Sequence, residues 1–267
     1  MGRIVTPIAK RRAPADTARI MDGPVLRIGI AGMTGRMGRL LADSVPAAGA
    51  VLAGGVGRAG DLADLAAGAD VIIDFTTQAT VRRHAGILAG SGIPWVLGTT
   101  GLTAADEVAV RAAAAQIPVF QAANFAPGVN LVFALAERLG AALAASTHDA
   151  EILEMHHRQK IDAPSGTAIS LGDAIARGRG VDLAAVMQSG RDGHTGPREA
   201  GAIGFAALRG GQIVGSHSAM FTSATEQITL THHALDRRIF ADGAVQAALF
   251  LATRPAGLYG MRDLLGL

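Results

Sequence analysis

The stretch from Val25 to Gly38, VLRIGIAGMTGRMG, decides the fold of this chain. Its first half is short, apolar and branched, which is typical of a buried strand. Its second half is a glycine turn, and a predicted helix follows through Leu41 and Val45. A strand, a glycine turn and a helix in this order are the context that a dinucleotide requires, because glycines bring the helix N-terminus up to the pyrophosphate. We therefore predict a dinucleotide site at this turn, with contacts from Gly32, Met33, Thr34, Gly35, Arg36 and Met37.

The residues that follow alternate between apolar runs and helical patterns. We expect four more strands, over 50–54, 70–77, 93–98 and 117–123, and helices near 79–89 and 104–116. Such alternation predicts an α/β fold with a Rossmann-like, doubly wound parallel sheet. Ligands bind at the carboxyl ends of the strands in such a sheet.

The end of the second strand bears on the choice of nucleotide. An NAD enzyme normally places an acid here for the ribose diol, but this strand ends Val56-Gly57-Arg58, with no carboxylate before Asp61. Arg58 has the geometry to pair with a 2′-phosphate. We therefore predict NADPH as the preferred cofactor, with NADH as the second; the alternative is that Arg58 is only a solvated turn residue.

The second half of the chain changes pattern. A helix over 131–144 is followed by predicted strands over 150–155, 203–209, 213–221 and 226–233, and Gly210-Gly211 predicts a hairpin between the second and third of these. We expect an inserted α+β substrate domain with a mixed, mostly antiparallel sheet. A last helix over 240–252 returns to the first domain. The predicted domains are a flexible N-terminal extension (1–24), a dinucleotide-binding domain (25–127), a substrate-binding and tetramerisation domain (128–237) and a C-terminal return (238–267).

The region 151–178 gathers groups that suit an anion. His156, His157, Arg158 and Lys160 are cationic or titratable, and Ser165 is a natural N-cap for the helix that begins at Gly166-Thr167. A helix N-terminus with separate cations suits a small, doubly charged acid. Taken singly, each feature has an ordinary explanation, as a solvated strand edge or a common helix start. Their combination in one short loop favours a functional site.

The same region carries a resemblance. Residues 156–168 read HHRQKIDAPSGTA, which resembles the signature of the 4-hydroxy-tetrahydrodipicolinate reductase (dihydrodipicolinate reductase) family of the bacterial and plant lysine pathway. That pattern also has a glutamate ahead of the histidines, which Glu154 matches, whereas Glu151 receives no role. The G-x-x-G-x-x-G spacing of 32–38 is also that of the family, and RDGHTG at 191–196 resembles its loop over the substrate.

The resemblance implies roles for individual residues. His156 is expected to be the general acid and Lys160 a second catalytic cation, while His157, Gly166 and Thr167 bind a substrate carboxylate. Two further loops are expected on the nicotinamide side of the cofactor, and their residues are Gly98, Thr99, Thr100, Ala123, Asn124, Phe125 and Ala126. Family members use both NADPH and NADH, and many keep an acid where this chain has Gly57, so the departure puts a preference for NADH in doubt. The family also implies a homotetramer, assembled through the open sheet of the second domain.

The predicted function is therefore the NAD(P)H-dependent reduction of 4-hydroxy-tetrahydrodipicolinate, a small dicarboxylate, to tetrahydrodipicolinate on the route to diaminopimelate and lysine. One alternative is a non-catalytic sensor of nicotinamide nucleotides on the same scaffold. Another is a different dehydrogenase of amino-acid metabolism. Aspartate-semialdehyde dehydrogenase needs a cysteine nucleophile, which this chain lacks, and homoserine dehydrogenase should lack the loop that begins at His156.

Composition excludes several other classes. The 267 residues contain no cysteine, which removes disulfides and thiolate chemistry and suits a cytoplasmic protein. The formal net charge is +2, of which residues 1–22 supply +3. The remainder is therefore −1, which argues against nucleic acid as a partner. We expect no membrane span, because no apolar run approaches the required length.

Two expectations concern the histidines and the N-terminus. No H-E-x-x-H motif occurs, and adjacent histidines on a strand point apart, so we predict no metal site. The remaining histidines are expected to be surface or packing residues; those considered are His84, His148, His217, His232 and His233. Residues 1–22 are either a targeting peptide or, as we prefer, a floppy extension ahead of a true start at Met21.

Overall fold

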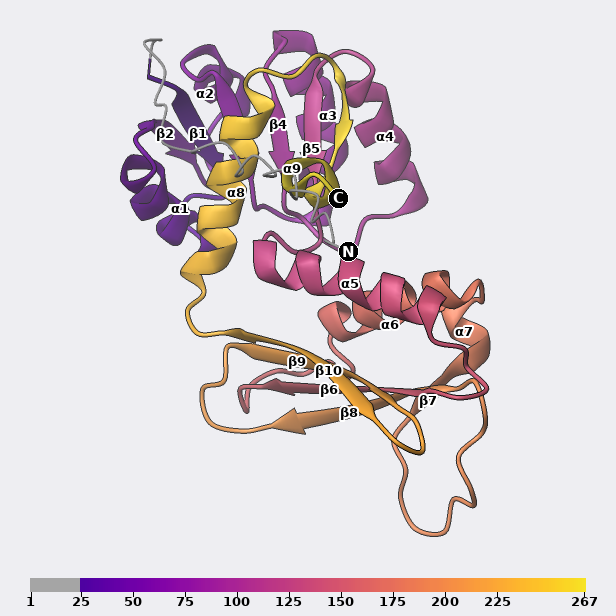
Figure 1. Cartoon of the computed structure of the whole chain (residues 1–267). Helices are drawn as coiled ribbons and strands as arrows, with labels where there is room; N and C mark the ends of the chain where they lie inside the picture. Colours follow the sequence, from indigo (N-terminus) through magenta and orange to yellow (C-terminus); the bar gives the residue numbers. More distant parts are fainter. Residues whose placement is uncertain (1–24) are drawn as a thin grey trace, which may run out of the picture.

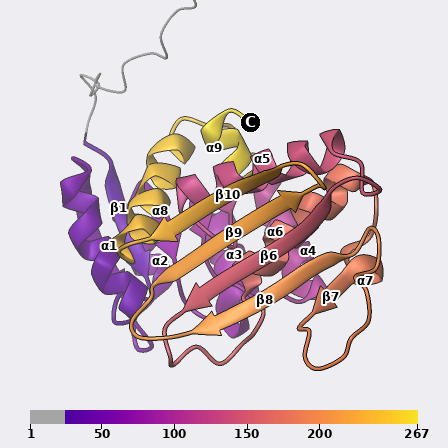
Figure 2. The same cartoon turned by 60° about the horizontal axis from the view of Figure 1, so that its bottom comes forward.

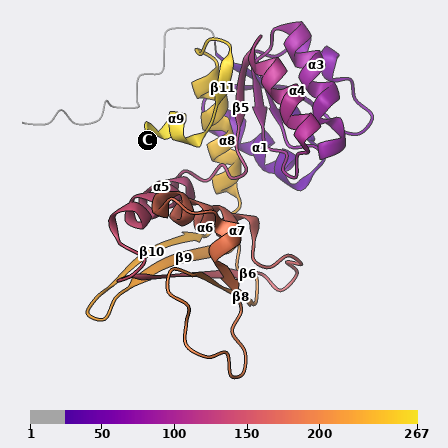
Figure 3. The same ribbon diagram turned by 90° about the vertical axis from the view of Figure 1, so that its right-hand side faces the viewer.

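The computed structural model describes residues 25–267, which form two units, each built on its own sheet (Figure 1). The predicted N-terminal extension, residues 1–24, lies outside the described residues. A layer of helices separates the two sheets (Figures 1 and 3).

The first sheet is the predicted doubly wound one. Its six strands are all parallel, in the order β11-β5-β4-β3-β1-β2. Their bounds are β1 (Arg27–Ala31), β2 (Val51–Val56), β3 (Val71–Asp74), β4 (Trp95–Leu97), β5 (Pro118–Gln121) and β11 (Gly257–Tyr259). The chain reverses its direction of winding between β1 and β3, and ligands of such sheets bind at this kind of switch point. The edge strand β11 was not predicted, since three residues beginning with glycine carry almost no strand signal.

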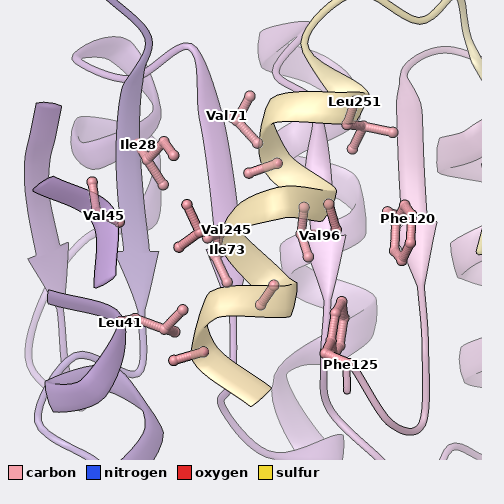
Figure 4. Close-up of a cluster of buried hydrophobic side chains, with 14 of the residues drawn as sticks. Ile28, Leu41, Val45, Val71, Ile73, Val96, Phe120, Phe125, Val245 and Leu251 are labelled. Carbon is pink, nitrogen blue, oxygen red and sulfur yellow. The ribbon is translucent and has the colours of Figure 1, made fainter. Parts of the chain in front are cut away.

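Helices cover both faces of this sheet. On one face lie α1 (Arg36–Ala47) and α8 (Arg238–Leu251), and on the other lie α2 (Leu62–Ala67), α3 (Val81–Ser91) and α4 (Ala104–Ala114), with the 3₁₀ turn η1 (Gln78–Thr80) before α3. Figure 4 shows α8 laying Val245 and Leu251 against strand residues such as Val71 and Val96. The last long helix of the chain therefore packs against the first sheet. Gly243 makes the close approach possible, because a Cβ there would lie 1.9 Å from the carbonyl oxygen of Phe125.

The second sheet is mixed, as predicted. Its order is β10-β9-β6-β8-β7, with two antiparallel and two parallel pairings. The strands are β6 (Asp149–His156), β7 (Met187–Ser189), β8 (Ile203–Arg209), β9 (Gly215–Thr222) and β10 (Gln227–Ala234).

The hairpin predicted at Gly210-Gly211 is wrong. β8 and β9 do not pair with each other, because β6 lies between them. The two glycines instead meet the end of β6: the Gly210 amide donates to the His156 carbonyl (2.9 Å), and the Arg158 amide donates to the Gly211 carbonyl (3.3 Å). The two glycines do mark a turn, but this turn crosses the end of β6. There it holds the backbone of His156 and Arg158 by hydrogen bonds.

Only one face of the second sheet is covered by helices of the described chain (Figures 2 and 3). The two helices that lie against it are α5 (Pro127–Ala142) and α6 (Gly166–Arg179). The short helix α7 (Leu183–Val186) lies at the end of this sheet, and α9 (Met261–Leu265) lies near the first sheet. α5 and α6 approach closely at Gly178, where a Cβ would lie 2.1 Å from the Glu137 carbonyl oxygen. The C-terminal end of α6 is therefore packed directly on the backbone of α5.

Candidate active site

Strand β6 delivers the first predicted site residue. Its residues alternate strictly, so that Ala150, Ile152, Glu154 and His156 are buried toward the helices while the residues between them face the other way. His156 is the last residue of the strand, and its imidazole therefore lies at the buried end of the sheet beneath the start of α6.

Glu154 holds that imidazole from below. Its carboxylate is 1% exposed and accepts a hydrogen bond of 2.5 Å from Nδ1 of His156. The same carboxylate accepts two bonds from the Arg209 guanidinium, at 2.8 and 2.9 Å, and one from the Ser165 amide at 3.1 Å. Burial raises the pKa of the Glu154 carboxyl, but the bonds from Arg209 and His156 outweigh it, and the pKa lies below its ordinary value.

His217 closes the other side of the imidazole. Its ring lies 5.1 Å from that of His156, edge to face, and its Nε2 is hydrogen-bonded to Ser165 Oγ at 3.1 Å. Burial, and then the neighbouring His156, lower the pKa of His217 to about 4. The ring is therefore neutral near pH 7, and it packs against His156 without adding charge.

The loop after β6 brings Lys160 and the helix start to the same place. Lys160 Nζ donates to both oxygens of Asp162, at 2.7 and 2.8 Å. Ser165 caps α6 as predicted, since its Oγ accepts from the Ala168 amide at 3.2 Å. Gly166 and Thr167 form the first turn, where unpaired N–H groups and the helix dipole favour an anion.

These groups open into one cavity of about 720 Å³ between the two units. His156, Lys160, Gly166 and Thr167 line it from the second unit. From the first unit, Thr100, Ala123 and Asn124 line it at the ends of strands β4 and β5. Asn124 Nδ2 also donates to Thr167 Oγ1 at 3.2 Å, so the two units touch at the cavity. The structure thus brings together predicted residues from regions of the sequence that lie far apart.

His157 lies elsewhere. It does not line this cavity; its Nε2 accepts from the Arg237 guanidinium at 3.1 Å, and its buried Nδ1 has no partner among the described residues. The carboxylate-binding role of His157 therefore stays a prediction.

A second cavity of about 460 Å³ lies at the switch point of the first sheet. The glycine turn lines it through Gly32, Thr34 and Gly35, and the loop after β2 adds Gly57 and Arg58. The first turn of α1 has no side-chain cap, so its N–H groups are open to an anion. Among the described residues no carboxylate lines this cavity, and Arg83 of α3 lines it as well. These features fit a phosphorylated dinucleotide.

The other predicted cofactor residues are placed less directly. Neither cavity is lined by Met33, Arg36, Met37, Gly98, Thr99, Phe125 or Ala126. Met33 fills the space above Gly55, and Phe125 and Ala126 are buried. Gly98 lies so close to the Phe75 ring that a Cβ would be 2.3 Å from it, and the buried Thr99 Oγ1 has no partner within residues 25–267.

Sequence reasoning missed the partners of the predicted residues. Glu154 matched the family pattern but received no role, and Arg209 and His217 were not recognised as its neighbours. Arg83 was likewise missed. Arg83 lies in the first turn of α3, after the loop that follows β3, and this place near the carboxyl end of a sheet strand was the available signal for a ligand contact. Glu151 pairs with Arg191 and Arg198 on the outer side of β6, away from both cavities.

Two other kinds of site are absent from the described part of the chain. No group of three or more histidine, aspartate or glutamate side chains between residues 25 and 267 is placed to hold a metal ion. Within the same residues, every helix is too short or too polar to cross a membrane.

Comparison with known proteins places the chain among reductases. Residues 26–125 match the family described as dihydrodipicolinate reductase, N-terminus, and residues 128–265 match its C-terminus. The chain is 78% identical to a 4-hydroxy-tetrahydrodipicolinate reductase of Acidiphilium cryptum over 92% of its own length and 100% of the relative's. It is 62% identical to one of Gluconacetobacter diazotrophicus, over 91% and 98% of the two chains.

The solved structures agree with this. A dipicolinate-bound dihydrodipicolinate reductase from Paenisporosarcina sp. TG-14 matches with a TM-score of 0.69 and 25% identity, over 90% of this chain and 99% of that one. A probable dehydrogenase from Thermotoga maritima, 13% identical with a TM-score of 0.57 over 90% and 92% of the two chains, shares the fold.

Proposed function

The chain belongs to the dihydrodipicolinate reductase family, and from that premise we propose how its two cavities carry out the reaction. The protein is an oxidoreductase that reduces 4-hydroxy-tetrahydrodipicolinate to tetrahydrodipicolinate in lysine biosynthesis. The nicotinamide nucleotide supplies the hydride. The 4-hydroxyl group leaves as water, which creates the conjugated imine that accepts the hydride, so that substrate, NAD(P)H and one proton give tetrahydrodipicolinate, NAD(P)+ and water. The protein must therefore bind a dicarboxylate beside the nicotinamide, stabilise the negative charge that hydride addition creates, and supply one proton.

The cavity between the two units is the proposed place of reaction. The observation that carries this proposal is the convergence of His156, Lys160 and the start of α6 with Thr100, Ala123 and Asn124 of the first sheet. In this proposal Gly166 and Thr167 bind one carboxylate through the helix N-terminus. Lys160 favours the charge that develops on the conjugated imine, and His156 donates the proton. The dipicolinate bound to the Paenisporosarcina reductase is a flat dicarboxylate of the size that such a site would take.

The cavity at the switch point is the proposed site for the adenosine end of the cofactor. We propose that NADPH is preferred over NADH. Arg58 and Arg83 line this cavity, and neither forms an ion pair or a side-chain hydrogen bond among the described residues. The absence of an acid at Gly57 supports the same choice, because no carboxylate there can bind the ribose diol of NADH. The position is also crowded, since a Cβ at Gly57 would lie 3.1 Å from the Thr34 side chain.

We further propose the predicted division into domains, with residues 128–237 as the substrate-binding and tetramerisation domain. The outer face of the second sheet supports a homotetramer, because no helix of the described chain covers it and it exposes Leu208 by 52%. Leu153, Met155 and Met220 lie on the same face. An apolar face of this kind requires a partner. We place the assembled enzyme in the cytoplasm.

A steady-state assay tests the reaction and the choice of cofactor together. The preceding synthase, supplied with pyruvate and aspartate semialdehyde, would generate the unstable substrate, and loss of nicotinamide absorbance would report turnover. We expect turnover with both nucleotides and a lower KM for NADPH. An equal or lower KM for NADH would overturn the cofactor proposal alone. Absence of turnover with either nucleotide, from protein that binds NADPH, would overturn the assignment of the site.

A further inference from the structure

Glu154 carries a fully buried carboxylate, and the reaction described so far assigns it no role. A carboxylate loses several kcal/mol of hydration when it is buried, unless partners replace the water. Here four donor groups do so: two N–H groups of Arg209, the Ser165 amide and His156 Nδ1. The shortest of these contacts, at 2.5 Å, is the one to His156.

A purely structural role would not need that contact. The first turn of α6 already has its cap, because Ser165 Oγ accepts from the Ala168 amide. Arg209 is anchored independently by the carbonyl oxygens of Leu208 and Asp162, at 2.7 and 2.6 Å. The bond from Nδ1 of His156 is therefore an additional feature, and it acts on the side chain that lines the reaction cavity.

The bond fixes which nitrogen of His156 carries hydrogen. A carboxylate accepts from Nδ1 only if that nitrogen is protonated, so the neutral ring is held as the Nδ1–H tautomer. Nε2 is then the nitrogen that gains or loses the catalytic proton. It has no hydrogen-bond partner in residues 25–267, and the ring lines the cavity.

We propose that Glu154 is a positioning residue, which orients His156 with Nε2 toward the substrate and stabilises the imidazolium that donates the proton. This inference rests on the proposed role of His156 as the proton donor. Arg209 and Ser165 hold the carboxylate in turn, so β6, β8 and α6 all contribute to the orientation of one ring.

The charges around the ring make Glu154 decisive. Four ionisable groups face it: Glu154, Lys160, Arg209 and His217. Burial lowers the pKa of His156, and Lys160 and Arg209 lower it further, whereas the hydrogen bond and charge of Glu154 raise it; the pKa stays below its ordinary value. Glu154 is thus the group that keeps a proton on a ring surrounded by burial and positive charge.

The variant Glu154→Gln tests this inference against the control Glu226→Gln, which makes the same change at an exposed turn of the same sheet. Turnover would be measured across pH with saturating nucleotide. We expect Glu154→Gln to lose roughly 10²-fold in kcat, the lower end of what a general acid supplies, with a change in substrate KM below about threefold.

The pH profile separates a positioning role from a structural one. A proton donor must be protonated, so kcat falls as pH rises through its pKa. Loss of Glu154 lowers that pKa, and the descending limb should therefore move to lower pH in Glu154→Gln. Glu154→Asp keeps the charge and should leave the limb where it is, with an intermediate kcat. A limb that does not move in folded Glu154→Gln would overturn the proposal.

A second measurement does not depend on turnover or on a variant that folds. The ¹⁵N shifts of the His156 ring in the wild-type protein report its tautomer, and we expect Nδ1–H. The Nε2–H tautomer would overturn the proposal even if the wild type reduces the substrate. Conversely, a wild type with the Nδ1–H tautomer but no turnover would refute the proposed reaction and leave the geometry of Glu154 intact.

Discussion

The two cavities differ in which parts of the chain form their walls. The nucleotide cavity at the switch point is shaped mainly by backbone, with glycines at the turn after β1 and two exposed arginines at its margin. The cavity between the units is shaped by side chains, and the buried Glu154 carboxylate that binds His156 behind the cavity has all its partners within the protein. Gly32 illustrates the first kind, with φ +90° and a carbonyl 2.6 Å from where a Cβ would be.

This difference predicts how each site fails. In a site formed mainly by backbone, the few side chains that contact the ligand are solvated. Removal of one of them weakens a contact without leaving a buried charge behind. In a buried network, removal of one member leaves its partners desolvated and unpaired, which is strongly destabilising. Substitutions in the reaction cavity should therefore reduce turnover severely, whereas substitutions at the margin of the nucleotide cavity should alter selectivity.

The largest effects are expected at His156, the proposed proton donor, and at the neighbouring Lys160. His156→Ala and Lys160→Ala should each lose roughly 10²–10⁴ in kcat, the usual scale for one acid–base or electrostatic group. The affinity for NADPH should stay within about twofold of the wild type, because neither residue lines the nucleotide cavity. Steady-state kinetics and nucleotide fluorescence titration measure the two quantities on the same samples.

Gln159→Ala is a matched control for this test, since Gln159 is exposed on the same loop and does not line the cavity. It should turn over at the wild-type rate. Losses below tenfold in pure, folded His156→Ala or Lys160→Ala would refute the catalytic role of the residue concerned.

The next effect concerns stability and pH. His217 is buried with a pKa of about 4, against about 6.5 in the unfolded chain. The unfolded state therefore binds more protons between these values, and stability falls as pH falls through that window. The pKa difference of about 2.5 corresponds to a loss of about 3 kcal/mol in the free energy of unfolding once the pH is below 4. More than half of this loss should already be present at pH 5.

Urea unfolding at pH 7.5 and pH 5 measures this loss. Other groups titrate in the same window, so the informative quantity is the pH-dependent part that His217→Gln removes. His148→Gln, which changes a half-buried histidine directly before β6 of the same sheet, serves as the reference. An equal pH dependence in His217→Gln and His148→Gln would mean that His217 is protonated in the folded protein.

A smaller effect is expected at the nucleotide cavity. Arg58→Ala and Arg83→Ala should each raise the KM for NADPH by about tenfold and leave the KM for NADH unchanged, because only NADPH carries the 2′-phosphate. Arg82→Ala is the control: Arg82 precedes Arg83 on α3 but pairs with Asp106 at 3.2 Å and does not line the cavity. An equal rise of both KM values would show that the arginines act on the shared part of the cofactor.

The sequence predicted the first sheet well because its signals are local. The glycine turn at 32–38 and the alternation of strand and helix patterns required no knowledge of distant residues. The hairpin at Gly210-Gly211 failed for the opposite reason: a glycine pair predicts a turn, but whether β8 pairs with β9 or with β6 depends on contacts between strands that lie far apart in the chain. The three-residue strands β7 and β11 were too short to show a period.

The proposed reaction site shows the same division between local and distant signals. His156, Lys160, Gly166 and Thr167 could be predicted because they stand in one short, unusual loop, and the structure brings them to one cavity. The carboxylate beneath them could be matched to a pattern but not explained, because its guanidinium partner lies 55 residues further along the chain. A buried network is specified by tertiary packing, and local sequence patterns do not report it.

The smallest expected effect concerns the partner of Lys160, and it tests where the buried network ends. Asp162 binds the Lys160 amine at 2.7 Å, but its side chain is 55% exposed, so the pair is a surface one of small net value. Asp162 also lines the cavity, where its negative charge repels the dianionic substrate. Asp162→Asn should therefore lower the substrate KM, by at most about fivefold, and leave kcat nearly unchanged. The difference should shrink as salt is raised, because exposed charges are screened. A tenfold loss of kcat would instead place Asp162 with Glu154 in the machinery that holds the proton donor, and the boundary between the solvated and the buried parts of the site would have to be redrawn.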